Sequence, residues 1–268
     1  MIIAVASGKG GTGKTTVAVN LALSIDAVLL DCDVEEPNCN IFLKKDLRDI
    51  EDVTLDVPVI NFKRCNFCGK CSEFCEYNAL AVTKENVLVF KELCHGCGGC
   101  KLVCPEDAIT YKKRKIGEVA GDGSFYQGKL NIGEAMATPV VSAVKKKIDR
   151  RKDTVIDAPP GASCPVIESV SKSDYCILVT EPTPFGLSDL RIAVEVLEKL
   201  GIPYGIVINR DGIGNEKVEE YCKENNIPIL MKIPYERKIA ELYSRGVPFT
   251  LEMPEWKERF RKLYEAIR

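Results

Sequence analysis

The sequence lacks the features of membrane, exported and nucleic-acid-binding proteins. No apolar run approaches the roughly 20 residues that a membrane-spanning helix needs. The formal net charge is only −2, so the composition does not indicate a general nucleic-acid-binding surface. The apolar start, residues 1–6, is short and leads directly into a glycine-rich loop, which is not the pattern of an export signal. We therefore expect a globular protein of the cytoplasm.

Cysteine, by contrast, is abundant. The chain contains 13 cysteines in 268 residues, and eight of them fall in two tight clusters. In a chain without an export signal, clustered cysteines more often bind metal than form disulfides. The other cysteines are scattered along the chain: Cys32, Cys39, Cys164, Cys176 and Cys222.

Short apolar runs alternate with helical patterns in two parts of the chain. Residues 2–6 and 27–31 read as buried strands around a helix at 14–24, and the alternation returns from residue 154 onward. This predicts an α/β fold, with a doubly wound, mainly parallel sheet covered on both faces by helices. A cysteine-rich repeat interrupts the pattern. We therefore predict a discontinuous main domain, residues 1–60 and 113–268, with a small α+β domain inserted at 61–112.

The first glycine-rich loop carries a complete nucleotide-binding motif. Residues 8–15 read GKGGTGKT, which matches G-x-x-x-x-G-K-[ST] between a predicted strand and a predicted helix. Backbone N–H groups of such a loop surround phosphate oxygens, and the helix N-terminus adds its dipole. Lys14 should reach the β- and γ-phosphates, and the Thr15 hydroxyl should ligate Mg²⁺. The residues expected at the nucleotide are Gly8, Gly10, Gly11, Thr12, Gly13, Lys14, Thr15 and Thr16.

A second lysine, Lys9, lies early in the same loop. With it, the segment KGGTGKTT resembles the deviant Walker A motif of the MinD/Mrp/ParA family of P-loop ATPases. In that family the early lysine crosses a dimer interface and contacts the phosphates that the other subunit holds. The resemblance therefore implies an ATP-dependent homodimer in which both Lys9 and Lys14 act in catalysis. The alternative is a solvated loop lysine.

Further segments resemble the same family, in the same order along the chain. LLDCDVEEPN, residues 29–38, resembles switch I, which implies that Asp33 orients the attacking water and Asp31 lies near the metal. VIDAPPG, residues 155–161, resembles Walker B and switch II, which implies that Asp157 faces the metal's water shell and Gly161 moves toward the γ-phosphate. VINR, residues 207–210, matches the strand whose asparagine, here Asn209, reads adenine. A guanine-reading N-K-x-D is absent, so ATP is expected rather than GTP.

The two cysteine clusters share one spacing. Cys65, Cys68, Cys71 and Cys75 form C-x₂-C-x₂-C-x₃-C, and Cys94, Cys97, Cys100 and Cys104 repeat it with Pro105 following. In two-cluster ferredoxins with this pattern, three cysteines of a run hold one [4Fe–4S] cluster and the fourth ligates the other. The resemblance to bacterial ferredoxins implies cluster one on Cys65, Cys68, Cys71 and Cys104. Cluster two would then lie on Cys94, Cys97, Cys100 and Cys75.

Other metal assignments fit these residues less well. Structural zinc sites usually need only two C-x₂₋₄-C pairs, and here eight cysteines stand in two ferredoxin runs. His95 lies inside the second run, and we interpret it as a loop residue near a sulfur rather than a ligand. Glu76 stands where ferredoxins usually have proline, which removes no ligand. Cys39 and Cys164 follow the two switch segments, so a metal site that bridges two subunits stays open.

The C-terminal stretch, residues 254–268, places Trp256, Phe260, Leu263 and Ile267 on one helical face. Glutamates dilute its basic charge, so we expect it to pack on the sheet rather than contact a membrane.

The whole chain thus resembles MinD-superfamily ATPases with an inserted ferredoxin domain, which implies ATP, Mg²⁺ and two [4Fe–4S] clusters as cofactors. The favoured hypothesis is an ATPase whose nucleotide-dependent dimer closure controls electron transfer to a redox or metallocluster-assembly protein not identified by the motifs. One alternative is a carrier or scaffold for iron–sulfur clusters. Another is an electron carrier whose nucleotide site only regulates docking.

Overall fold

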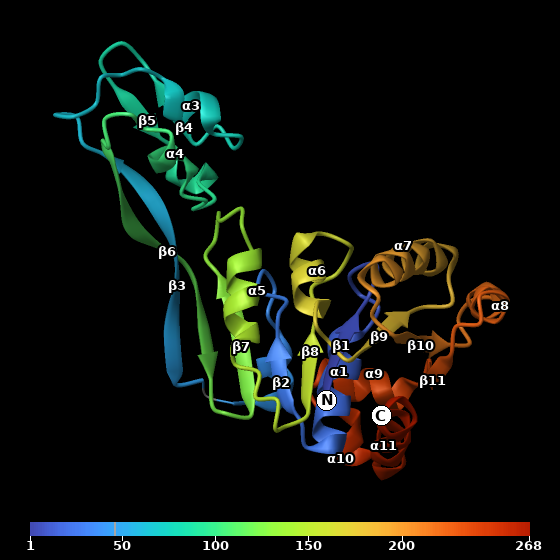
Figure 1. Ribbon diagram of the computed structural model, residues 1–268. Coiled ribbons are helices and arrows are strands. Elements are labelled where there is room, and N and C mark those ends of the chain that lie inside the picture. The colour runs from blue at the N-terminus through green and yellow to red at the C-terminus, as the bar shows by residue number, and fades with distance from the viewer. Residues whose placement is uncertain (46) are drawn as a thin grey trace. The chain divides into compact units, whose positions relative to one another are not determined.

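The computed structural model describes residues 1–45 and 47–268, which divide into two compact units (Figure 1). The first unit consists of Met1–Ile50, Val119–Lys129 and Thr138–Arg268, and the second of Glu51–Glu118 and Leu130–Ala137. The strands are β1 (Ile2–Ala6), β2 (Val28–Asp31), β3 (Asp49–Ile60), β4 (Leu80–Val82), β5 (Val87–Val89), β6 (Ile109–Gly121), β7 (Phe125–Leu130), β8 (Thr154–Asp157), β9 (Tyr175–Thr180), β10 (Tyr204–Asp211) and β11 (Ile229–Pro234). The helices are α1 (Lys14–Ile25), α2 (Cys39–Leu43), α3 (Lys70–Phe74), the 3₁₀ turn η1 (Lys91–Leu93), α4 (Gly99–Leu102), α5 (Thr138–Lys145), α6 (Cys164–Val170), α7 (Pro184–Leu200), α8 (Lys217–Glu224), α9 (Arg237–Ser244), α10 (Phe249–Glu252) and α11 (Pro254–Ile267).

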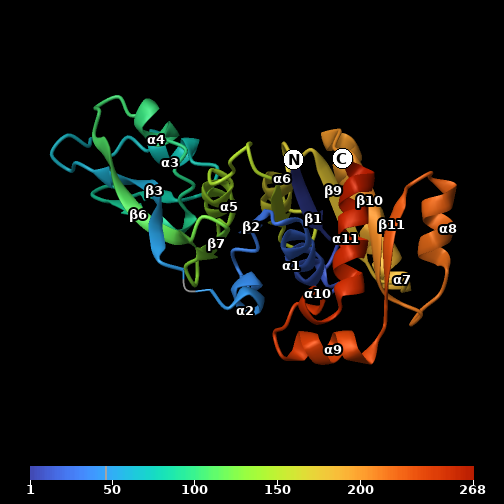
Figure 2. The same ribbon diagram turned by 90° about the horizontal axis from the view of Figure 1, so that it is seen from below.

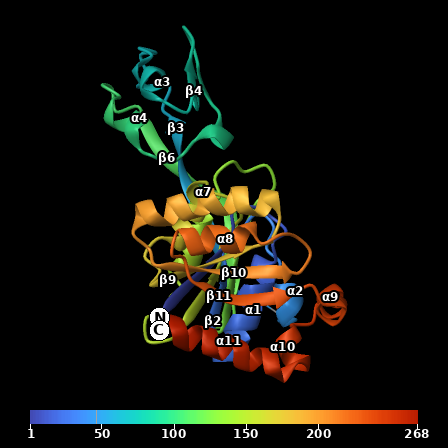
Figure 3. The same ribbon diagram turned by 90° about the vertical axis from the view of Figure 1, so that its right-hand side faces the viewer.

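A nine-stranded, mainly parallel sheet runs in the order β11-β10-β9-β1-β8-β2-β7-β6-β3. Within this sheet, every pair of neighbouring strands from β11 to β7 is parallel. In Figure 3 the strands of the first unit lie between α7 on one side and α11 on the other. This confirms the predicted α/β class. Strands covered on both faces are buried along their whole length, as β1 and β8 are, and β1 is apolar at every position.

The register of the central strands places their carboxyl ends side by side. Val5 of β1 pairs with Asp157 of β8, and Asp157 pairs with Asp31 of β2. Parallel strands present their carboxyl ends at one edge of the sheet, where open α/β folds bind ligands. The loops after these strands therefore gather at one place, although they are far apart in the sequence.

The C-terminal helix packs into the core of the first unit. Trp256, Phe260 and Leu263 of α11 belong to the same buried cluster as Val17 and Leu21 of α1, and Figure 2 shows α11 beside α1. The predicted packing of this apolar face is thereby confirmed. Within the described residues, no helix has the length and apolar character needed to cross a membrane.

The second unit contains the cysteine-rich repeat. Its short antiparallel pair β4–β5 aligns Leu80 with Val89 and Val82 with Val87, and a small apolar core joins Leu80 and Val87 to Ile109. The unit takes in more of the chain than residues 61–112. β6 continues without a break past residue 112, because no turn-forming residue interrupts its extended sequence there.

The packing of α11 generates a stability prediction. Phe260→Ala should lower the free energy of unfolding by about 3–5 kcal/mol, because Phe260 is fully buried and its removal leaves a cavity. Urea unfolding followed through the fluorescence of Trp256, the single tryptophan, would measure the loss in the first unit. Phe185→Ala is the control, since Phe185 is 77% exposed and should change stability by at most about 0.5 kcal/mol. Equal losses in both variants would contradict the packing described.

Candidate functional site

The glycine-rich loop joins β1 to α1 and opens the helix at Lys14. Gly13 has φ +90°, and a Cβ there would lie 2.2 Å from Nδ2 of Asn209. Only glycine accommodates both the left-handed backbone and this close approach. The Asn209 amide donates a hydrogen bond to the Thr12 carbonyl oxygen at 2.8 Å. Asn209, which lies on β10, thus holds the glycine-rich loop in place. The resemblance of residues 207–210 to adenine-reading strands did not predict this contact.

Lys14 lies buried among carboxylates. Its Nζ is 3.2 Å from Oδ2 of Asp33 and 3.8 Å from Oδ1 of Asp157. Burial alone would lower the pKa of Lys14, but the charges of Asp157 and Asp33 outweigh this effect and raise it. The lysine therefore stays an ammonium ion at neutral pH, which is the form that binds phosphate oxygens.

The Walker B aspartate, Asp157, is fully buried at the end of β8. Its Oδ2 accepts a hydrogen bond from the Thr15 hydroxyl at 2.7 Å. Its Oδ1 accepts none within the part of the chain that the structure describes. Burial raises the pKa of Asp157, and Lys14 and Thr15 oppose that rise. A buried carboxylate oxygen without a hydrogen bond, next to a threonine hydroxyl, suits a hard divalent cation or a water molecule bound to one.

Asp31 supports the switch I segment. Its two carboxylate oxygens accept hydrogen bonds from the backbone N–H groups of Asp33 at 3.2 Å and of Asn38 and Cys39 at 3.0 Å each. Burial and the charge of Asp157 raise the pKa of Asp31 to about 7, although the amides of Cys39 and Asn38 act in the opposite direction. Asp31 therefore shapes the backbone that carries Asp33.

The two cysteines after the switch segments differ in exposure. Cys39 is fully buried, and its Sγ lies 3.5 Å from Oδ2 of Asp157. Burial, reinforced by the charge of Asp31, raises the pKa of Cys39 well above its usual value. Cys164 is exposed. The Cys39 thiol is thus enclosed within its own chain beside Asp31 and Asp157, whereas the Cys164 thiol is open to solvent.

Lys9 forms an ion pair within its own chain. Its Nζ lies 3.7 Å from a carboxylate oxygen of Glu181, and Arg210 pairs with the other oxygen. Glu181 is buried and directly follows β9. Sequence reasoning missed it. The available signal was its position just beyond an apolar strand, at the sheet edge where the loops gather.

The switch II glycine contacts the start of the nucleotide loop. Gly161 has φ +96°, and its N–H donates to the Ser7 carbonyl oxygen at 3.0 Å. The Ser7 hydroxyl donates in turn to the carbonyl oxygen of Lys9 at 2.7 Å. The segment that ends at Gly161 and the glycine-rich loop are thereby connected through Ser7.

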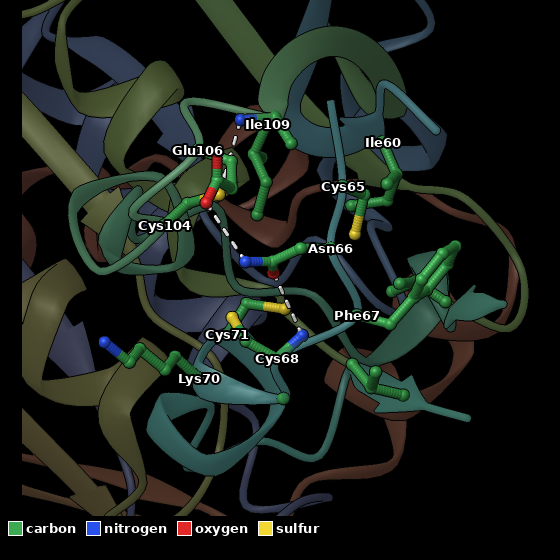
Figure 4. Close-up of a pocket in the computed structure, with 14 residues that line it drawn as sticks. Ile60, Cys65, Asn66, Phe67, Cys68, Lys70, Cys71, Cys104, Glu106 and Ile109 are labelled. Carbon is green, nitrogen blue, oxygen red and sulfur yellow. Dashed lines mark hydrogen bonds between the residues drawn. The ribbon is translucent and has the colours of Figure 1, made fainter. Parts of the chain in front are cut away.

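The second unit holds two cysteine-lined cavities. The first is lined by Cys65, Cys68, Cys71 and Cys104, with Phe67, Val82 and Ile109 among its apolar walls (Figure 4). The second is lined by Cys75, Cys94, Cys97 and Cys100. Each cavity thus brings together three cysteines of one run and the last cysteine of the other, and all eight thiols are free.

The two crossing cysteines have matching surroundings. The N–H of Ala79 donates to Cys75 Sγ at 3.4 Å, and the N–H of Ala108 donates to Cys104 Sγ at 3.3 Å. Hydrogen bonds from backbone amides stabilise negative charge on sulfur, as metal-bound thiolates require. The cysteine sets, apolar walls and amide donors therefore fit iron–sulfur clusters.

The second cavity also contains aromatic residues whose positions the spacing could not predict. The rings of Tyr77 and His95 stack with centroids 3.5 Å apart and an interplanar angle of 6°. His95 thus lies beside the cysteines, as expected for a loop residue, with its ring against Tyr77. The Tyr111 hydroxyl lies 3.4 Å from Cys100 Sγ.

Comparisons with known proteins agree with the nucleotide-loop geometry. The chain is 36% identical over 261 residues to the uncharacterized protein MJ0579 of Methanocaldococcus jannaschii, covering 93% of this chain and 91% of that protein. It is 25% identical over 272 residues to the iron-sulfur cluster carrier protein of Pyrococcus horikoshii, covering 93% of this chain and 79% of that one. Among solved structures, the septum site-determining protein MinD of Pyrococcus horikoshii, complexed with Mg-ADP, has a similar fold, with a TM-score of 0.60 at 21% identity and coverage of 99% and 95%. The model of the CobQ/CobB/MinD/ParA nucleotide binding domain matches residues 3–249, and the chain belongs to this family.

Proposed function

We propose that this protein binds and hydrolyses ATP as a homodimer and uses the nucleotide cycle to control electron transfer through two [4Fe–4S] clusters held in an inserted ferredoxin-like domain at residues 61–112. The partner would be a redox or metallocluster-assembly protein. The observation that carries the proposal is the sorting of eight cysteines into two cavities, on the same chain as a complete nucleotide loop.

The cysteine sets support cluster binding in particular. Cluster one would be held by Cys65, Cys68, Cys71 and Cys104, and cluster two by Cys75, Cys94, Cys97 and Cys100. Structural zinc sites usually need only two C-x₂₋₄-C pairs, whereas here each run contributes three cysteines to one cavity and its fourth to the other, as in two-cluster ferredoxins. When bound, the clusters would supply one-electron redox chemistry. The chain's own contribution is the apolar wall around the thiolates and the two amide donors.

The nucleotide site supports phosphoryl chemistry. Lys14, whose pKa is raised, would offer its positive charge to the β- and γ-phosphates. Thr15 would hold Mg²⁺ directly and Asp157, its hydrogen-bond partner, would hold it through the water shell. Asp33 lies on switch I within 3.2 Å of the Lys14 ammonium. When phosphate oxygens replace Asp33 as the partner of the Lys14 ammonium, the Asp33 carboxylate would be free to orient the attacking water. Gly161, already bonded to the loop, would carry switch II toward the γ-phosphate.

Coupling between the two activities would follow from chain connectivity. Both segments of the second unit, Glu51–Glu118 and Leu130–Ala137, lie in sequence between the switch residues Asp33 and Asp157. The second unit is covalently connected to the chain segments that carry the two switches. A nucleotide-dependent movement of either switch would therefore be transmitted to its connections. If nucleotide binding changes the free energy of cluster reduction, then cluster reduction must change the free energy of nucleotide binding by the same amount.

Cluster transport is the second candidate. The names of relatives at 24–25% identity, iron-sulfur cluster carrier proteins of Pyrococcus horikoshii and Methanocaldococcus jannaschii, favour it. Against it stand two complete sets of four cysteines, because fully ligated clusters are held tightly. An electron carrier with a purely regulatory nucleotide site is disfavoured by the intact Lys14, Thr15 and Asp157.

Metal analysis tests the cluster assignment. Anaerobically prepared protein should contain about eight iron and eight acid-labile sulfide per chain, and Cys75→Ser should lose about half of each. Cys176→Ser is the control, because Cys176 is buried in β9 and should leave the metal content unchanged. Stoichiometric zinc without sulfide would refute the assignment. Transfer of the iron to an apo-ferredoxin within minutes would favour the carrier function instead.

ATP hydrolysis tests the nucleotide site. Lys14→Ala should abolish Mg²⁺-dependent phosphate release and weaken ATP binding, because it removes the cation that neutralises phosphate charge. Asp33→Ala should also abolish release, yet still bind ATP in an equilibrium titration. Lys217→Ala on α8 serves as the matched lysine control. Hydrolysis at the wild-type rate in Asp33→Ala would exclude Asp33 from orienting the water.

Dimerisation tests the role of Lys9. In the Asp33→Ala background, which should retain ATP, the protein should sediment as a dimer with ATP and as a monomer with ADP. Adding Lys9→Ala should abolish the ATP dimer while leaving monomer nucleotide affinity nearly unchanged, because Lys9 would leave Glu181 to reach the partner's phosphates. The exposed Lys199 on α7 provides a control substitution. A persistent ATP dimer in the Lys9→Ala variant would mean that Lys9 has no role between subunits.

A further inference from the structure

The Tyr111 hydroxyl of β6 lies between the Gly98 carbonyl oxygen and the Cys100 sulfur in the second cysteine-lined cavity. It donates a hydrogen bond to the Gly98 carbonyl oxygen at 2.7 Å and lies 3.4 Å from Cys100 Sγ. Gly98 and Cys100 flank the start of the short helix α4, and Cys100 is buried. The phenol ring of Tyr111 packs against the small core that includes Leu80 and Ile109. Its position is therefore set by apolar packing as well as by the hydrogen bond.

The number of protons at this contact depends on the state of Cys100. A free thiol carries its own proton and can donate it to the Tyr111 oxygen while Tyr111 donates to Gly98. A metal-bound Cys100 is a thiolate and has no proton. A hydrogen bond between Tyr111 and this sulfur therefore requires the phenol to donate its proton. The Gly98 carbonyl oxygen also accepts from the N–H of Lys101 at 3.2 Å. It therefore keeps a hydrogen-bond partner when the phenol proton turns toward sulfur.

We propose that Tyr111 tunes the cluster held by Cys75, Cys94, Cys97 and Cys100, by donating a hydrogen bond to the Cys100 thiolate that raises the reduction potential of this cluster alone. The inference rests on the proposed function, because it requires clusters in the two cavities. Reduction increases the negative charge on the ligating sulfurs, so a hydrogen bond to sulfur stabilises the reduced state more than the oxidised state.

Among the residues that the structure describes, the first cavity has no equivalent donor. The counterpart of Cys100 in the first cysteine run is Cys71, because each is the third cysteine of a run with the same spacing. Within the described residues, no side-chain hydroxyl lines that cavity, and no side chain donates a hydrogen bond to its cysteine sulfurs. The two cavities are thus alike in their cysteine sets and amide donors and differ in the phenol. The Tyr111 hydroxyl thus gives two sites with equivalent cysteine sets different electronic surroundings.

The test is a redox titration of Tyr111→Phe followed by electron paramagnetic resonance. Phenylalanine keeps the ring in the core and removes only the hydroxyl. With iron and sulfide content equal to the wild type, one of the two midpoint potentials should fall and the other should stay unchanged. Tyr77→Phe is the matched control, because Tyr77 lines the same cavity and its ring stacks on His95. It loses a hydroxyl for which the described residues show no contact with sulfur, so neither potential should change.

A second variant keeps the test independent of cluster assembly in Tyr111→Phe. Replacing Tyr111 alone with 3-fluorotyrosine retains the hydroxyl and makes it a stronger donor, so the same midpoint should rise. Unchanged potentials in both variants, with full iron content, would overturn the inference while leaving the cluster assignment intact. A wild-type protein without iron and sulfide would overturn the proposed function itself. A fall in potential of equal size in Tyr77→Phe would mean that polarity of the cavity, and not the bond to Cys100, sets the potential.

Discussion

The buried ammonium of Lys14 is the constraint around which the first unit is organised. A charge with almost no exposure to water costs several kcal/mol unless it is paired, and here it is neutralised by carboxylates at the ends of two strands, Asp33 after β2 and Asp157 on β8. Those strands can deliver carboxylates to one lysine only because β1, β8 and β2 are parallel neighbours. The glycine loop, the switch segments and the sheet order thus form one electrostatic arrangement, and phosphate and Mg²⁺ are the ligands that would complete it.

Around that centre the same sheet edge collects further polar groups. Asn209 of β10 holds the glycine loop through Thr12, and Glu181 after β9 holds Lys9. Asp31 accepts three backbone amides and so fixes the path of the chain that carries Asp33. Each of these contacts restrains a segment that would meet the nucleotide. In this site the supporting contacts are as specific as the groups proposed for chemistry.

The second unit is built around a duplicated cysteine run. Two runs with equal spacing each contribute three cysteines to one cavity and one to the other, so neither cavity is complete without both runs. The crossing joins the two halves of a unit whose own apolar core is small. Metal binding at such sites would add stability that this core alone does not supply. Among the described residues, Tyr111, Tyr77 and His95 line the second cavity and not the first, so two sites with equivalent cysteine sets have different surroundings.

The sequence by itself determined the features that depend on local pattern. The loop at residues 8–15, the alternation of apolar strands with helices and the apolar face of the terminal helix could be read directly, because periodicity and glycine spacing are properties of neighbouring residues. The equal spacing of the cysteine runs belongs to the same class, and it suggested which cysteines to group. Only the tertiary structure decided the partners of Lys9, the role of Asp31 as an acceptor for backbone amides, the burial of Cys39 and the contact of Tyr111 with Cys100. Glu181 is far from Lys9 in the sequence, and β6 crosses a boundary that composition placed at residue 112. Such contacts depend on strand order and register, and no local pattern in the chain encodes them.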